Sequence, residues 1–206
     1  MKFTEDDFKN IKKAIDEGGK IWENKILLSF KKKFKSYYRS ISNDQCCYCK
    51  RDIKAEFKMV IDIEHILPKS EFVDLMFDVI NLSVSCKRCN MNIKKEDYSF
   101  VKDSKLIKEN HLDKDLYKII HPNLDSYFDH LNYNVEIVNE LKIVKYRVVG
   151  ESEKGDFTYK YFKLFEFEID LMNHAQGIVV RDELSELIDF DTAKEIKELL
   201  NKLKAK

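Results

Sequence analysis

Residues 46–49 read Cys-Cys-Tyr-Cys, and residues 86–89 read Cys-Lys-Arg-Cys. Each stretch contains a CxxC pair, which presents two thiolates to one metal ion from a single turn. Two such pairs complete a tetrahedron of soft sulfur ligands, an arrangement that favours zinc. A lone CxxC is also typical of a redox dithiol, but two pairs indicate a closed, structural zinc site. The expected ligands, called here the four-cysteine cluster, are Cys46, Cys49, Cys86 and Cys89.

The fifth cysteine, Cys47, is left over from these pairs. We expect it to be a bystander, although it could replace a neighbouring cysteine as a ligand. The N-terminus has no apolar signal core, and no segment approaches the roughly 20 apolar residues of a membrane span. We therefore expect a cytoplasmic protein outside the membrane, where thiols stay reduced and tend to bind metal.

The composition is that of a folded protein. Hydrophobic residues make up 44% of the 206 residues, while Gly and Pro number only five and two, which excludes a disordered chain and favours a helix-rich one. The formal net charge is zero, but residues 25–58 carry ten basic and three acidic side chains, whereas residues 151–191 carry four and eleven. The basic segment is expected either to attract phosphates or to be an ordinary solvated helix face.

The two CxxC pairs enclose a long insert. Residues 50–85 number 36, more than the roughly 15–20 residues of a simple zinc ribbon. The insert contains the sequence Asp-Ile-Glu-His-Ile-Leu-Pro-Lys-Ser at residues 62–70 and the pair Asn81-Leu82, and Asn90 and Lys94 follow the second CxxC. The insert is therefore expected to contain a functional site that the metal centre supports.

The ordered set CxxC, EHILPKS, NL and CxxCNxxK resembles the zinc-knotted branch of the HNH endonucleases, over residues 46–94. The resemblance implies an α+β fold with a ββα-metal (HNH) core. We expect helices before and after this core, and one added β-hairpin. The resemblance also implies a site in the core that binds one divalent metal ion, Mg²⁺ or Mn²⁺, in addition to the structural zinc.

The resemblance also assigns roles to individual residues. His65 would be the general base, because imidazole titrates near the working pH. Asn81 would hold the His65 ring, or its loop, through its amide. Glu64 and Asn90 would bind the catalytic metal ion, since hard oxygen ligands suit Mg²⁺ or Mn²⁺ and not a second zinc.

Two further residues are candidates for this site. Asp62 is a rival or additional acidic ligand, since many members of the family carry Asp or His in place of Glu64 and His in place of Asn90. In a regular strand Asp62 and Glu64 share one face and His65 takes the other, so the strand must end or bulge for Glu64 and His65 to converge. Lys94, one helical turn beyond Asn90, is expected to contact a phosphate.

The flanking sequence predicts further elements. Thr4 and Asp7 form a capping box for a first helix, which Gly18 and Gly19 end. Apolar residues at helical spacing predict a second helix over residues 20–38. The other expected elements are strands at 57–65 and 82–85, a helix from 90 to beyond 95, a short helix within 121–132, a hairpin over 135–149 with its turn at 139–140, and two closing helices, the last from 191.

We divide the chain into an N-terminal helical arm (1–40), the nuclease core with the four-cysteine cluster (41–105) and a C-terminal helix and hairpin region (106–206). The expected function is cleavage of phosphodiester bonds in nucleic acid, DNA ahead of RNA. The competing interpretations are a zinc ribbon that binds nucleic acid without cutting it and a scaffold subunit. The pair Glu64-His65 with Asn81 separates them, because a pure binding module does not need these residues.

The chain also resembles the PtuB-like group of small HNH effector nucleases in bacterial anti-phage systems. The features that carry this resemblance are EHILPKS, the CxxCN helix start and the segment HPNLDSYFDH at residues 121–130, followed by the hairpin. The resemblance implies a role in antiviral defence beside an ATPase partner. Residues 106–206 would then dock the partner or gate the site, with Glu166, Glu168 and Asp170 as a candidate docking face.

Overall fold

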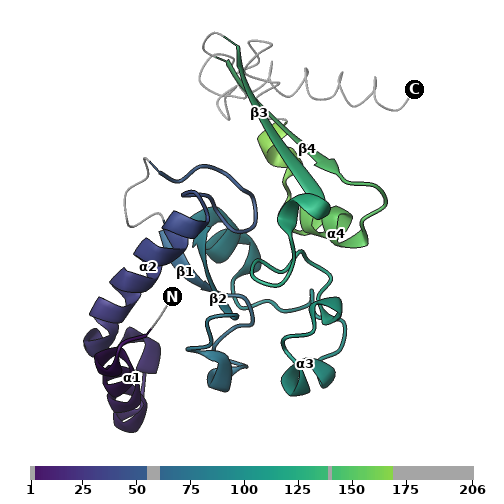
Figure 1. Cartoon of the computed structure of the whole chain (residues 1–206). Coiled ribbons are helices and arrows are strands. Elements are labelled where there is room, and N and C mark those ends of the chain that lie inside the picture. Colours follow the sequence, from purple (N-terminus) through teal and green to yellow (C-terminus); the bar gives the residue numbers. More distant parts are fainter. Residues whose placement is uncertain (1–2, 55–60, 139–140, 169–206) are drawn as a thin grey trace, which may run out of the picture.

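The structure, a computed structural model of the chain, describes residues 3–54, 61–138 and 141–168, and Figure 1 shows how the elements lie in space. The helices and strands are α1 (Glu5–Glu17), α2 (Leu28–Ile41), β1 (Ile61–His65), β2 (Leu82–Cys86), α3 (Leu106–Glu109), β3 (Leu131–Val138), β4 (Leu141–Val148) and α4 (Glu153–Tyr161). A π-helix, η4, spans Arg88–Lys94. The fold is therefore mixed α+β. None of the described helices is long and apolar enough to span a bilayer.

The N-terminal segment begins as predicted and then departs from the prediction. Thr4 and Asp7 form the expected capping box, and Gly18 ends α1 with a φ of 68°. The predicted helix over 20–38 is instead two short 3-10 turns followed by α2, which extends to Ile41. Asn24 explains the break, because its backbone is extended, with a ψ of 130°, and its side chain accepts a hydrogen bond from the Ile26 backbone N–H.

The first sheet is the antiparallel pair β1–β2, in which Ile61 pairs with Cys86 and His65 pairs with Leu82. All five residues of β2 are buried. The helix α2 lies beside this hairpin in Figure 1 and contributes Phe30, Phe34 and Tyr38 to the core. The register places the second CxxC pair at the end of β2 and the Glu64-His65 pair at the end of β1. The predicted strand began at residue 57, and residues 57–60 lie outside the described residues.

The helix that follows the second CxxC differs in start and type from the prediction. It was expected to begin at Asn90 and continue past Lys95, but it spans Arg88–Lys94 as a π-helix. The Lys95 backbone N–H donates to the Asn90 carbonyl over 2.6 Å, a hydrogen bond between residues five apart that is typical of a π-turn. Lys95 then ends the helix with a positive φ of 54°.

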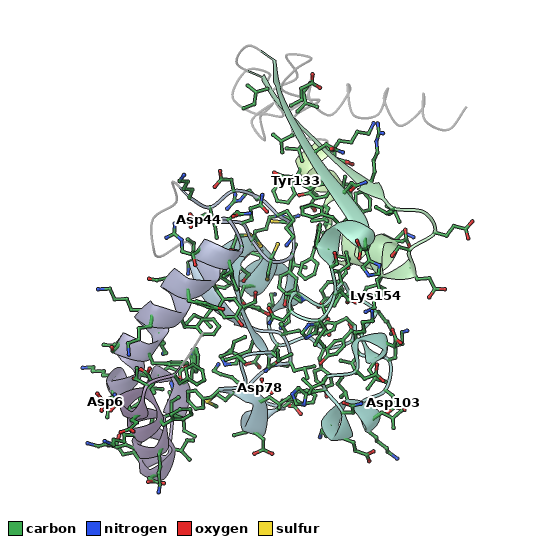
Figure 2. The ribbon with its side chains drawn as sticks, in the orientation of Figure 1. Asp6, Asp44, Asp78, Asp103, Tyr133 and Lys154 are labelled. Atoms are coloured by element: carbon green, nitrogen blue, oxygen red, sulfur yellow. The ribbon has the colours of Figure 1, made fainter. Side chains whose placement is uncertain are left out.

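The second sheet is the predicted hairpin, β3–β4, which begins at Leu131 and is paired in regular antiparallel register as far as Val138 and Leu141. Its predicted turn at 139–140 lies outside the described residues, as does the closing helix predicted from residue 191. The base of the hairpin packs against the four-cysteine cluster: the Tyr146 hydroxyl donates to the Cys49 carbonyl over 2.6 Å. Side chains from both sheets belong to one hydrophobic core, and Figure 2 shows the described side chains on the ribbon.

Candidate active site and metal centre

The four-cysteine cluster forms the centre of the core. The sulfur atoms of its four members lie within 4.8 Å of one another, and all four residues are fully buried. Cys49 Sγ and Cys86 Sγ lie 3.9 Å apart. A tetrahedral zinc site with Zn–S bonds of about 2.3 Å requires sulfurs roughly 3.8 Å apart, so the donor set and its spacing fit a structural zinc ion. The predicted grouping of these cysteines is confirmed.

Cys47 stands apart from this cluster. Its backbone N–H donates to the Val84 carbonyl over 3.0 Å, and its side chain is buried. Burial raises the pKa of its thiol. Among the described residues, the only group of three or more His, Cys, Asp or Glu side chains that could hold a metal ion is the four-cysteine cluster without Cys47.

Glu64 and Lys94 form a buried ion pair. Each side chain is 1% exposed, and Lys94 Nζ lies 2.9 Å from Glu64 Oε1. The Tyr48 hydroxyl donates to the same oxygen over 3.1 Å. Burial raises the pKa of Glu64, and the Lys94 charge and the Tyr48 hydrogen bond oppose that effect. Lys94 therefore faces the core as the counter-ion of Glu64. Its contact with a phosphate stays a prediction.

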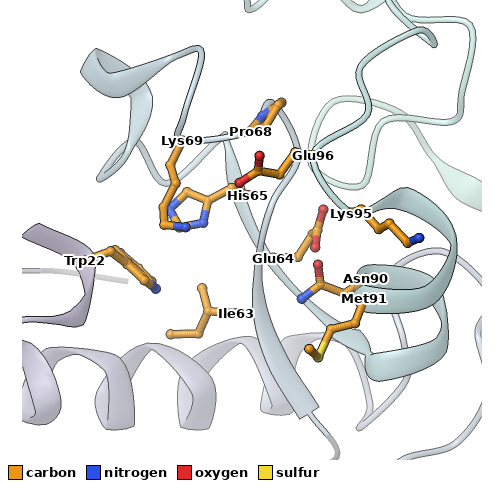
Figure 3. A pocket seen from close by; sticks show the side chains of 10 residues that line it. All are labelled: Trp22, Ile63, Glu64, His65, Pro68, Lys69, Asn90, Met91, Lys95 and Glu96. Carbon is orange, nitrogen blue, oxygen red and sulfur yellow. The ribbon is translucent and has the colours of Figure 1, made fainter. Parts of the chain in front are cut away.

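His65 lies on the other side of the strand, as Figure 3 shows. Its ring meets the Trp22 ring edge-on with centroids 4.4 Å apart, and its Nε2 lies 3.1 Å from the Met76 carbonyl oxygen. A carbonyl oxygen can only accept, so Nε2 carries the hydrogen and Nδ1 keeps a free lone pair. Burial lowers the pKa of His65 to about 4, so the ring is neutral at pH 7.

Asn81 supports the loop after β1 and makes no hydrogen bond to the His65 ring. Its Oδ1 accepts from the Leu67 backbone N–H over 2.7 Å, and its Nδ2 donates to the Leu67 and Leu75 carbonyls over 3.0 and 3.1 Å. Of the two predicted roles, holding the ring or holding the loop, the geometry matches the second. The loop in turn carries the Met76 carbonyl that accepts from His65.

Asn90 and Asp62 lie on the Glu64 side of β1. Asn90 Nδ2 donates to Asp62 Oδ2 over 3.3 Å, and Asp62 also lies 3.6 Å from the Lys87 ammonium. In Figure 3 the Asn90 side chain, projecting from η4, faces the Glu64 carboxylate. Asp62 therefore lies beside the two expected ligands and is already engaged by an amide and an ammonium group.

One pocket of about 360 Å³ brings the two sides of the strand together. It is lined by Glu64, His65 and Asn90, and its remaining walls include Trp22 and Lys69. The strand is regular to His65 and ends there, so the two neighbouring side chains point to opposite faces but open into one cavity. Sequence reasoning missed Trp22, because it lies more than 40 residues upstream in a segment with no motif.

Polar groups from a later segment of the chain support the backbone around Asn81. Asn123 Nδ2 donates to the Ile80 and Leu82 carbonyls, each over 2.8 Å, on both sides of Asn81. Asn123 is anchored in turn, because its backbone N–H donates to the Nδ1 atom of the buried His121 over 3.2 Å. The HPNLDSYFDH segment therefore holds the end of the loop between β1 and β2 in place, which the sequence motif alone did not reveal.

Comparison with known proteins gives one curated relative. The Septu protein PtuB of Bacillus thuringiensis is 29% identical over 89 residues, which cover 43% of this chain and 32% of that protein. The match therefore spans about a third of the length of the relative. No protein-family profile matches the chain, and no solved structure matches it.

Proposed function

We propose that this chain is a metal-dependent endonuclease of the HNH type that hydrolyses phosphodiester bonds. The observation that carries the proposal is the shared pocket at the end of β1, into which Glu64, His65 and Asn90 open together. A carboxylate, a neutral imidazole and a carboxamide that open into one pocket are groups that metal-dependent phosphodiester hydrolysis can use. A zinc ion in the four-cysteine cluster would be structural, because four thiolates leave it no open position.

His65 is suited to activate water. Its Nδ1 lone pair would take a proton from a water molecule while the water oxygen attacks phosphorus and the bond from phosphorus to the leaving oxygen breaks. The hydrogen bond from Nε2 to the Met76 carbonyl fixes the tautomer that this step requires. The low pKa makes the ring a weak base in the free protein, but a phosphate anion entering the pocket would raise that pKa toward the working range.

Glu64 and Asn90 would hold a divalent ion. The contacts that the Glu64 carboxylate receives from Lys94 and Tyr48 are both made to Oε1, which leaves Oε2 for an ion. Magnesium binds through one or two protein oxygens while keeping several waters, so the small donor set is compatible with it. Such an ion would neutralise charge on the phosphate and the leaving oxygen.

The same buried pair favours a second candidate function. Lys94 already neutralises Glu64, so the carboxylate has less to gain from a divalent ion than a free one would. A zinc-ribbon subunit that binds nucleic acid without cleaving it, or a scaffold subunit, would have no need of that ion. The two candidates therefore differ in whether the purified chain cleaves nucleic acid when Mg²⁺ or Mn²⁺ is added.

The test is a digestion of plasmid DNA and of RNA with Mg²⁺, Mn²⁺ or EDTA, comparing wild type with His65→Ala. We expect metal-dependent cleavage of DNA ahead of RNA, and loss of at least two orders of magnitude in rate for His65→Ala. His111→Ala is the matched control, because His111 pairs with Asp78 and does not line the pocket. Cleavage that survives His65→Ala unaltered would refute the role of His65, and binding without any cleavage would favour the second candidate.

The similarity to the Septu protein PtuB supports a role in anti-phage defence. On this proposal the nuclease works beside an ATPase partner, and the region after the nuclease core docks that partner.

Of the three acidic residues proposed for docking, Glu166 and Glu168 are described, and Asp170 lies outside the described residues. Arg88 Nη2 lies 2.7 Å from Glu166 Oε2, and the Glu168 carboxylate accepts from the Tyr146 N–H and the Tyr159 hydroxyl. Both acidic residues thus have internal partners, so charge reversal there would disturb the fold as well as docking.

A further inference from the structure

Basic side chains repeat along one face of α2. Lys31, Lys35 and Arg39 follow one another at every fourth position, which places successive cations on one helix face with a rise of roughly 6 Å. They line a groove of about 330 Å³ whose other walls are Leu28, Lys32, Ser36 and Ile61. The rise between these cations is comparable to the distance between neighbouring phosphates along one nucleic-acid strand.

The lysines of this groove differ from its arginine, Arg39, which lies 2.5 Å from the Asp44 carboxylate. The carboxylates of Glu23 and Asp62 act on Lys31 and Lys35 from beyond ion-pair distance. Among the described residues, Lys31, Lys32 and Lys35 form no ion pair with a carboxylate, whereas Lys33, on another face, lies 3.0 Å from Asp7. The Lys35 ammonium donates to the Ile61 carbonyl over 2.7 Å, and the Lys31 ammonium donates to the Trp22 carbonyl. Each ammonium has three N–H groups, so both keep donors for an incoming anion.

Like charges four residues apart destabilise a helix. Burial also lowers the pKa of Lys31 and of Lys35, which adds a cost to keeping them charged. A helix stabilised only for its own folding would gain from acidic residues at some of these positions. Lysines kept without an ion pair on a grooved surface are instead typical of a site that binds a polyanion.

The groove leads to the proposed active site. Lys31 lies over the Trp22 ring, 4.7 Å from its centroid, and the same ring packs against His65. The positive charges of Lys69 and Lys31 both contribute to the low pKa of His65, so both lie close enough to act on its ring. Lys69 stands beside His65 in Figure 3, which continues the line of cations to the pocket.

We propose that this face of α2 binds the sugar–phosphate backbone of a nucleic-acid strand and guides it to the His65 pocket. The guiding role rests on the proposed function, but binding at α2 does not depend on cleavage. Lysine and arginine contacts to phosphates carry no base specificity, so the surface would bind different sequences alike. An acidic protein partner that bound α2 would not need the line of cations to continue into the His65 pocket, whereas a nucleic-acid strand would.

The experiment measures binding in the His65→Ala background, which separates binding from cleavage. Fluorescence anisotropy with labelled DNA across a salt series gives the slope of log K against log salt concentration. We expect Lys32→Gln with Lys35→Gln to weaken binding to all sequences and to reduce the slope by about 1.4 for single strands or 1.8 for duplex. Glutamine keeps a donor for the Ile61 carbonyl and is a good helix former.

The control, Lys102→Gln with Lys105→Gln, makes the same charge change in exposed residues just before α3, which Figure 1 places well apart from α2. Its slope should stay at the value of the His65→Ala parent. An unchanged slope in the α2 pair, or equal loss in both pairs, would overturn the inference. Lys32→Gln alone changes one exposed residue and should give about half of the effect. This single variant keeps the proposal testable if the double variant does not fold. Intact binding at α2 with no cleavage by the wild type would instead refute only the nuclease proposal.

Discussion

Removing the Lys94 charge tests the central electrostatic feature of the site. Lys94→Met deletes the ammonium group but keeps an unbranched side chain that fills most of the space. Glu64 would then lose its counter-ion while remaining 1% exposed. The His65 carbonyl would also lose the hydrogen bond that it accepts from Lys94 over 2.9 Å.

The expected magnitude follows from the burial of both partners. Breaking a buried ion pair by removing one charge costs about 3–5 kcal/mol, because the remaining charge is left without compensation. The Tyr48 hydroxyl still donates to Glu64, so we expect the lower end, about 3 kcal/mol. An exposed pair such as Lys160 with Asp156, whose side chains are 71% and 51% exposed, should contribute little.

The assay is urea unfolding in the presence of zinc, applied to Lys94→Met, Glu64→Gln and the double variant. The double variant should be more stable than the sum of the single changes implies, because no unpaired charge remains. Lys160→Met is the control and should unfold close to the wild-type midpoint. A loss below about 1 kcal/mol for Lys94→Met, or strict additivity in the cycle, would refute the assignment of a buried ion pair.

Four further outcomes follow from the same structure. Chelation of the metal, or Cys89→Ser, should unfold the core, and near-ultraviolet circular dichroism that is unchanged without metal would contradict this. Gly155→Ala should destabilise the protein in thermal melts although alanine favours helices, because a Cβ there would lie 2.2 Å from the His130 carbonyl oxygen. Tyr146→Phe should cost about 1–2 kcal/mol in urea unfolding, because a buried carbonyl loses its donor. Burial lowers the pKa of His121 to about 3, below its unfolded value near 6.5, so its contribution to stability is complete above pH 6.5 and declines as the pH falls toward 3. His121→Asn should therefore flatten the stability profile in that window by up to about 1.4 kcal/mol per pH unit, and an unchanged profile would contradict this.

The sequence predicted the local features well. The capping box at Thr4, the four-cysteine cluster and the β3–β4 hairpin each depend on residues close in sequence or on a repeated spacing. The second predicted helix was wrong over residues 20–27, because the backbone at Asn24 is extended and the helical spacing of apolar residues does not reveal that break.

The sequence did not predict the burial of Lys94, for a different reason. Its spacing from Asn90 identified a neighbour on the same helix but not the face that the helix would bury. That face was decided by Glu64, thirty residues earlier, whose burial required a cation beside it. The support from Trp22 and Asn123 likewise comes from segments more than 40 residues away from the groups that they contact.

The sequence by itself determined which chemical groups are covalent neighbours: two thiolate pairs, and a carboxylate next to an imidazole at the end of a strand. Tertiary structure alone decided how those groups are tuned. The Met76 carbonyl selects the His65 tautomer, Lys94 neutralises Glu64, and Lys31 lies over the Trp22 ring that packs against His65. These effects depend on distance and burial between segments far apart in the chain, and electrostatic free energy varies with both.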